Sequence, residues 1–156
     1  MLTNNEPSRL LLIERVFLLK SLTIFSDTPE TILAEIAELM QEEEVEEGKD
    51  IVKEGETGQC MYIIFKGKVR IHKGHHDLAM LSERDFFGEL SLLDTEKRSA
   101  TATTLADCTL FRIDQDPFYD VLEQRPEVIR GVMKILCKRL RAANHRISEL
   151  TGSGRV

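Results

Sequence analysis

The central part of the chain, residues 44–114, is a series of short strand-like segments separated by glycines, and this feature constrains the fold more than any other. The segments are rich in Val, Ile, Tyr and Phe, and the glycines that punctuate them are Gly48, Gly55, Gly58, Gly67 and Gly74. No helical pattern separates neighbouring segments, whereas βαβ units need a crossover helix between parallel strands. The pattern therefore predicts a β-roll or a β-sandwich.

Helical patterns flank the strand region on both sides. Before it, Leu12, Val16 and Leu19 recur at helical spacing. After it, the pattern is helical as far as Leu150, with a break at Arg125-Pro126 because proline interrupts a helix. A chain of 156 residues is long enough for one domain with its own core. We expect a single α+β, mainly β, domain over residues 1–156, with N-terminal helices at about 8–41, the β-roll at about 42–115 and C-terminal helices at about 116–150.

Composition limits the classes of function. The formal net charge of −6 argues against nucleic-acid binding by this chain alone, because phosphate binding needs a basic face. No apolar run approaches the ~18 residues of a membrane helix, and the polar N-terminus lacks the basic start of a signal peptide, so no membrane insertion is expected. The three cysteines, Cys60, Cys108 and Cys137, are far apart and odd in number, which favours reduced thiols in a cytoplasmic protein.

One acid and one base are conspicuous in the segment FFGELSLLDTEKRSATA, residues 86–102. Glu89 and Arg98 are nine positions apart, whereas an ion pair along a helix needs a spacing of three or four. Gly88 precedes the acid, and the small residues Ser99 and Ala100 follow the base. The spacing suggests that something else is held between the two charged side chains.

This segment resembles the phosphate-binding cassette of the cyclic-nucleotide-binding domains of catabolite activator proteins, protein kinase A regulatory subunits and nucleotide-gated channels. The cassette reads F-G-E-L-(A/S)-L, a short insert, and R-(S/T/A)-A. The resemblance covers nearly the whole chain, since VEEGKDIVKEGETGQCMYIIFKGKVRI is similar to the first strands of the family. It implies an eight-stranded β-roll, or jelly roll, flanked by N-terminal helices and by the family's B and C helices at the C-terminus. The ligand-binding residues that it implies are Gly88, Glu89, Leu90, Arg98, Ser99 and Ala100.

The chemistry of these residues agrees with the resemblance. A cyclic 3′,5′-phosphodiester is a monoanion, and the planar fork of Arg98 can meet both of its free oxygens. Gly88 has no Cβ, so the backbone can approach the ligand closely, and a short helical turn after it can direct N–H groups at the phosphate. The N–H groups of Ser99 and Ala100 add donors. Ionised Glu89 only accepts hydrogen bonds, which suits the ribose 2′-hydroxyl.

The resemblance is less specific about the base. In the family, threonine at the position of Ser99 can help to bind guanine, and alanine usually accompanies cAMP, so serine departs from both patterns. Serine occurs in bacterial cAMP binders; cAMP is therefore the expected ligand, with cGMP as the alternative, and no cofactor is expected. Positions that match relatives add candidates for the pocket wall and the base cap: Val69, Ile71, Leu81, Arg141 and Asn144.

Two alternatives use a similar fold. One is a degenerate member of the family, in which the acid and the base of the cassette form an ordinary ion pair and no ligand binds. The other is a cupin-type metalloenzyme, because cupins share the β-roll and His72, His75 and His76 lie close together in the sequence. A cupin also needs a histidine on a later strand, whereas the remaining histidine, His145, falls in a helix. We therefore expect neither catalytic nor metal-binding residues.

The predicted function is that of a non-enzymatic sensor, in which ligand binding is coupled to movement of the C-terminal helices. Its output is a fused effector domain or a protein partner. The last helix carries an apolar heptad seam, which predicts either a homodimer or packing on the β-roll of the same chain: Ile129, Met133, Leu136, Leu140, Ala143, Ile147 and Leu150. The basic face at residues 130–146 is more simply explained as a solvated or dimer-flanking helix face, which the overall acidity of the chain supports. A transcription factor of the catabolite activator type needs a further helix-turn-helix domain, so DNA binding by this chain alone is not expected.

Overall fold

The order of elements is helices, then strands, then helices. A computed structural model describes residues 9–152, with side chains from residue 12 onward. The helices are α1 (Arg9–Ser21), the 3-10 helix η1 (Thr23–Phe25), α2 (Glu30–Ala37), α3 (Glu89–Leu93), α4 (Gln115–Gln124) and α5 (Pro126–Thr151). The strands are β1 (Gln41–Val45), β2 (Asp50–Val52), β3 (Thr57–Gly58), β4 (Cys60–Lys66), β5 (Val69–Lys73), β6 (His76–Leu81), β7 (Phe86–Phe87), β8 (Glu96–Lys97), β9 (Thr101–Thr104) and β10 (Cys108–Asp114). The predicted element order and the break before Pro126 are confirmed.

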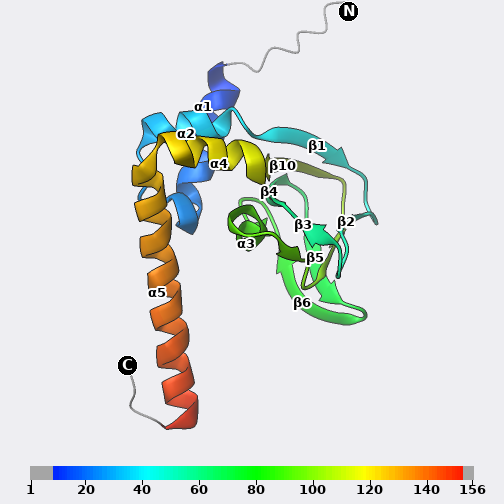
Figure 1. Ribbon diagram of the computed structural model, residues 1–156. Coiled ribbons are helices and arrows are strands. Elements are labelled where there is room, and N and C mark those ends of the chain that lie inside the picture. The colour runs from blue at the N-terminus through cyan, green and yellow to red at the C-terminus, as the bar shows by residue number, and fades with distance from the viewer. Residues whose placement is uncertain (1–8, 153–156) are drawn as a thin grey trace, which may run out of the picture. The chain divides into compact units, whose positions relative to one another are not determined.

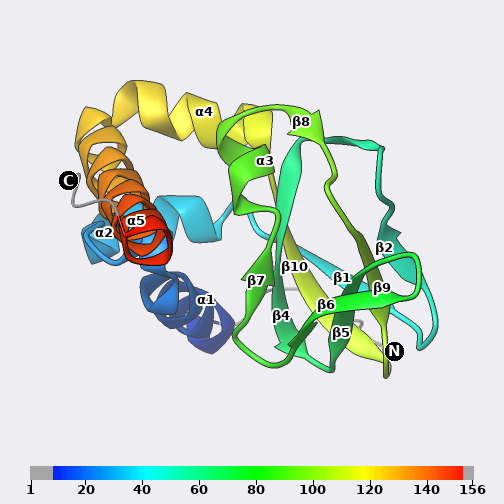
Figure 2. The ribbon, with the colours of Figure 1, turned by 90° about the horizontal axis from the view of Figure 1, so that it is seen from below.

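The strands form two four-stranded antiparallel sheets. The first has the order β1-β10-β4-β7, and the second has the order β2-β9-β5-β6 (Figures 1 and 2). These eight strands account for the predicted β-roll, and the two-residue strands β3 and β8 form a small additional pair. All the pairings are antiparallel, as expected for segments that no crossover helix separates. The predicted fold class is confirmed.

The chain consists of two compact units, which are described separately. One unit is Ile36–Val121 and holds all the strands of the described chain; the other combines the residues up to Glu35 with those from Leu122 onward.

The strand unit has a hydrophobic core between its sheets. The buried members of this core are Val52, Tyr62, Ile64, Val69, Ala102, Cys108 and Leu110. Four successive residues of β4, from Met61 to Ile64, are buried, so this strand is covered on both faces. Tyr62 stacks on Phe87 of β7, with ring centroids 5.3 Å apart. This contact anchors the strand that leads directly into the predicted cassette.

A chain of hydrogen bonds ties together three strands of the second sheet. The buried ring of His72 on β5 contacts the Gly74 carbonyl through Nδ1 and the Thr103 hydroxyl through Nε2, both at 2.7 Å. The Thr103 hydroxyl on β9 donates to Asp50 Oδ1 on β2 at 2.6 Å. His72 therefore has a structural role in the sheet, while His75 and His76 are exposed. Within residues 9–152, no group of three or more His, Cys, Asp or Glu side chains could hold a metal ion.

The helical unit packs through one face of α5. Val128, Val132 and Ile135 are buried, and α5 contacts η1, in which Ile24 and Phe25 are buried. At the start of α5, Arg125 forms an ion pair with Glu35 at 2.6 Å. The hydrogen bond from Arg125 lowers the pKa of Glu35.

The predicted heptad seam lies on a different face of α5 from this buried stripe. Four of its residues are between 57% and 83% exposed: Met133, Leu140, Ile147 and Leu150. The helix therefore carries two apolar faces, and the longer one is open to solvent.

Measured by length and hydropathy, none of the helices within the described part of the chain could cross a bilayer.

Candidate functional site

A glycine with a left-handed backbone begins the site. Gly88 has φ +80° and stands between β7 and the five-residue helix α3. A Cβ at this position would lie 2.5 Å from Arg98 Nη1 and 3.1 Å from the Cys60 carbonyl oxygen. Both the backbone conformation and the close approach of the arginine therefore require glycine here. The residues that follow Gly88 turn sharply, because the Ser91 N–H donates back to the Gly88 carbonyl at 3.0 Å.

The predicted cassette residues surround one cavity. Gly88, Glu89, Leu90, Arg98, Ser99 and Ala100 all line a space of about 400 Å³ beside α3, which we call the cassette cavity. Ile71, a predicted wall residue, also lines it. The other lining residues are Val52, Phe87, Ser91, Glu96, Lys97 and Ala102. Segments before and after the short insert are thus brought together, as the motif predicts.

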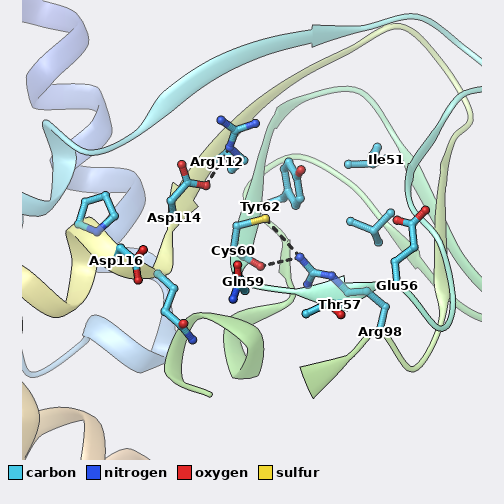
Figure 3. A pocket seen from close by; sticks show the side chains of 13 residues that line it. Ile51, Glu56, Thr57, Gln59, Cys60, Tyr62, Arg98, Arg112, Asp114 and Asp116 are labelled. Atoms are coloured by element: carbon cyan, nitrogen blue, oxygen red, sulfur yellow. Dashed lines mark hydrogen bonds and ion pairs between the residues drawn. The ribbon is translucent and has the colours of Figure 1, made fainter. Parts of the chain in front are cut away.

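Arg98 is the buried charge of this site, with only 8% of its surface exposed. Its Nη2 donates to the Cys60 carbonyl oxygen at 2.8 Å and to Cys60 Sγ at 3.2 Å (Figure 3). A Cβ at Gly58 would lie 2.6 Å from Arg98 Nε. The guanidinium therefore occupies a slot formed by two glycines, and Cys60 lies next to its Nη2 atom.

The small sheet formed by β3 and β8 positions Arg98. Gly58 pairs with Glu96, and Thr57 pairs with Lys97. The Arg98 N–H donates to the Glu56 carbonyl at 2.7 Å, which continues this pairing past the strand ends. These backbone hydrogen bonds fix where the side chain begins, so a strand pair of four residues determines the position of the buried charge.

A second cavity, of about 490 Å³, shares Arg98 and Val52 with the cassette cavity. We call it the strand-end cavity, and its other lining residues are Ile51, Glu56, Thr57, Gln59, Cys60, Tyr62, Arg112, Asp114, Gln115, Asp116 and Pro117 (Figure 3). Arg112 forms ion pairs with Glu43 and with Asp114, the latter at 3.0 Å. The Arg112 guanidinium is thus paired with carboxylates of the protein.

Burial and neighbouring charges shift two pKa values in the strand-end cavity. Burial, and then the adjacent Cys60 thiol, raise the pKa of the Tyr62 hydroxyl above its ordinary value. Burial acts to lower the pKa of Arg112, but the carboxylates of Glu43 and Asp114 outweigh it and raise that pKa. Both groups therefore keep their protons at neutral pH, the phenol neutral and the guanidinium charged.

The remaining predicted residues are not among those that line the cassette cavity. Val69 is fully buried in the core, opposite Leu81 on the neighbouring strand, two positions along β5 from Ile71. Arg141 and Asn144 are exposed on α5, in the helical unit, and their role as base caps stays a prediction.

Sequence reasoning missed two residues that lie against the Arg98 side chain, namely Gly58 and Cys60. Gly58 was visible only as one of several glycines that punctuate strands, and nothing in the sequence marked Cys60.

The fold and the site define a β-roll domain with a ligand-sized cavity around a buried arginine. The family model described as "Cyclic nucleotide-binding domain" matches residues 42–125, which is more than half of the chain. The chain belongs to this family, and the predicted resemblance is confirmed.

Relatives in sequence and in structure agree with this assignment. The chain is 30% identical over 132 residues to a CRP-like cAMP-activated global transcriptional regulator of Mycobacterium tuberculosis, covering 81% of this chain and 59% of the regulator. It is similar to the N-terminal domain of a transcriptional regulator from Streptomyces coelicolor, with a TM-score of 0.79, 28% identity, and 83% and 94% of the two chains covered. It is also similar to the regulatory domain of Toxoplasma gondii PKA, crystallised with cAMP, with a TM-score of 0.70, 28% identity, and 74% and 46% covered. The chain thus spans about three fifths of the length of the mycobacterial regulator.

Proposed function

We propose that this chain binds a cyclic 3′,5′-nucleotide, with cAMP as the ligand, and that it acts as a non-enzymatic sensor. The observation that carries this proposal is the arrangement of six cassette residues around one cavity, with Arg98 buried beside it. The volume of about 400 Å³ lies within the range of small-molecule sites, roughly 300–1,000 Å³. The mycobacterial relative is described as cAMP-activated, and the Toxoplasma domain was crystallised with cAMP, which favours the same ligand here.

Charge explains the preference for a cyclic monoanion. The hydrogen bonds of the Arg98 side chain go to a carbonyl oxygen and a thiol, both of them neutral acceptors. A phosphodiester would supply the negative partner that a buried guanidinium favours, through a charge-assisted contact. A nucleoside 5′-monophosphate is nearly dianionic, and its extra charge would face Glu89 across the cavity. Glu89 instead suits the ribose 2′-hydroxyl, as an acceptor.

The proposed output is a shift in the population of helix conformations. Leu90 follows Glu89 in α3 and is 62% exposed, so an apolar side chain of the cassette is available to repack when a ligand orders it. A coupling free energy of about 1–3 kcal/mol is typical for such switches. The ligand can move the helices only as far as its affinity differs between their two positions. A fused effector domain or a protein partner would read this movement.

Calorimetric titration with cAMP, cGMP and 5′-AMP tests the proposal. We expect a cyclic nucleotide to bind in preference to 5′-AMP. Arg98→Ala should lose at least ~2 kcal/mol of binding free energy, about 30-fold in Kd, because it removes a charge-assisted contact. A folded wild-type protein that bound neither cyclic nucleotide would leave the degenerate family member as the better description.

We also propose that the exposed seam of α5 forms a homodimer. Large apolar side chains at heptad spacing, open to solvent, are typical of a coiled-coil partner surface. Sedimentation with and without cAMP should show a dimer, and Leu140→Asp on the seam should dissociate it. Lys138→Asp, a control outside the seam on the same helix, should not. A wild-type monomer under both conditions contradicts the dimer and leaves the ligand site untouched.

A further inference from the structure

Each nitrogen of the Arg98 guanidinium has an identified neighbour. Nε faces Gly58 and Nη1 faces Gly88, since a Cβ at either glycine would lie within 2.6 Å of the respective nitrogen. Nη2 points to Cys60, where it donates to the carbonyl oxygen at 2.8 Å and to Sγ at 3.2 Å. Neither glycine has a side chain that could accept a hydrogen bond from the guanidinium. The only side-chain acceptor among these three neighbours is therefore the Cys60 thiol.

The shape of a guanidinium makes Nη2 essential for holding a phosphate with two hydrogen bonds. The two bidentate faces of arginine pair Nη2 either with Nε or with Nη1, because the N–H groups of Nε and Nη1 diverge. Nη2 carries two hydrogens, and both of the acceptors to which it donates belong to Cys60. A phosphate fork on either face needs one of these hydrogens and therefore competes with the contacts to Cys60.

The thiol contact is the one that can be released. The Cys60 carbonyl belongs to the backbone of β4, where the residue pairs with Asp114 of β10. The thiol is only a weak acceptor, and it turns about a single side-chain bond. Cys60 is half-buried and also lines the strand-end cavity, which gives Sγ space into which it can turn (Figure 3).

We propose that the Cys60 thiol competes with the phosphate of the ligand for Arg98 Nη2, and thereby sets the affinity of the cassette. Cys60 is a positioning residue that acts through Arg98. In the free protein its thiol holds the guanidinium in the slot, and binding of the cyclic phosphodiester displaces that thiol while the carbonyl contact persists. This inference rests on the proposed function of the cassette cavity.

Substitutions of Cys60 that differ in their ability to accept a hydrogen bond test the competition. Cys60→Ala removes the competing acceptor, so cAMP should bind about threefold more tightly in calorimetric titration. Cys60→Ser keeps an acceptor at the same place and should stay within about twofold of the wild type. A purely structural role would weaken binding in Cys60→Ala, which is the opposite direction. Cys137→Ala, at an exposed thiol on α5, is the matched control and should leave Kd unchanged.

The outcomes separate this inference from the function on which it rests. A wild-type protein that binds no cyclic nucleotide contradicts the proposed function. Wild-type binding with an unchanged or weaker Kd in Cys60→Ala overturns the competition alone. Thermal unfolding of each variant confirms that it is folded, and Cys60→Val, which has a similar volume and suits a strand, takes the place of Cys60→Ala if that variant does not fold.

Discussion

The two cavities that meet at Arg98 are built in different ways. Apart from Val52 and Ile71, every residue that lines the cassette cavity lies between 87 and 102. The strand-end cavity is assembled from residues 51–62, Arg98 and residues 112–117. A contiguous segment can carry a motif, whereas a wall drawn from separate strand ends exists only after those strands have paired.

The cavities also differ in how their charges are satisfied. In the strand-end cavity, Arg112 is held by two carboxylates, Glu43 and Asp114, and the ion pair with Glu43 links β10 to β1. The side chain of Arg98, which lines both cavities, donates instead to neutral acceptors on Cys60. This contrast indicates that the first arrangement serves the sheet, while the second leaves a cation for an anionic ligand.

Gly88→Ala should produce the largest change in the cassette cavity after loss of the arginine itself. The new Cβ would stand 2.5 Å from Arg98 Nη1, so the guanidinium must leave its slot and cAMP affinity should fall by at least about tenfold. The positive φ adds a stability cost of about 1–2 kcal/mol. Calorimetry and thermal unfolding measure the two effects separately.

Gly48→Ala is the control for that substitution. Gly48 has the same φ of +80°, and a Cβ there would meet nothing within 4 Å. It should lose the same stability and keep the wild-type affinity. Equal affinity losses in the two variants would mean that backbone strain, and not the slot, determines binding.

A smaller effect is expected at Glu89, which also lines the cassette cavity and is proposed to bind the ribose. Glu89→Gln replaces a charged acceptor by a neutral one, so its hydrogen bond to the ribose 2′-hydroxyl should weaken by about 1 kcal/mol, or fivefold. The loss should be seen for cAMP and not for its 2′-deoxy analogue. Parallel titrations of both ligands check this, and an equal loss for the two would place Glu89 away from the ribose.

The smallest effect on binding is expected in the strand-end cavity. Asp114→Asn breaks an ion pair whose two side chains are about one third exposed, so stability should fall by no more than ~1 kcal/mol. The Kd for cAMP should stay within about twofold of the wild type. A loss comparable to that of Gly88→Ala would show that both cavities serve the ligand, and the contrast between them would fail.

Apart from Ile71, the parts of the site that the sequence predicted lie close together along the chain. Gly88, Glu89 and Arg98 belong to one segment, and local turns bring them together. Gly58 reaches the arginine through the pairing of β3 with β8, and Cys60, at the start of β4, lies 38 positions before Arg98. No local pattern encodes such a pairing.

The fold was predictable for a similar reason, and its least predictable part was the long helix α5. Short strands without crossover helices require antiparallel pairing, and a proline ends the helix that precedes Pro126. In α5, however, the apolar seam predicted from the sequence does not include Val128, Val132 and Ile135, which are the buried residues of this helix. Two apolar stripes on one helix have the same period, so periodicity alone cannot say which of them is covered.

The slot around Arg98 also affects how the domain can change over generations. Unlike Gly88, Gly58 does not have a positive φ, so only neighbouring atoms exclude a Cβ at position 58. These atoms belong to the Arg98 guanidinium and to the Ser91 hydroxyl, and the hydroxyl can rotate away. A lineage that lost Arg98 would therefore tolerate a side chain at position 58. Once position 58 carried a side chain, arginine could return at position 98 only after glycine had returned at position 58. A loss of ligand binding would therefore be hard to reverse through single substitutions.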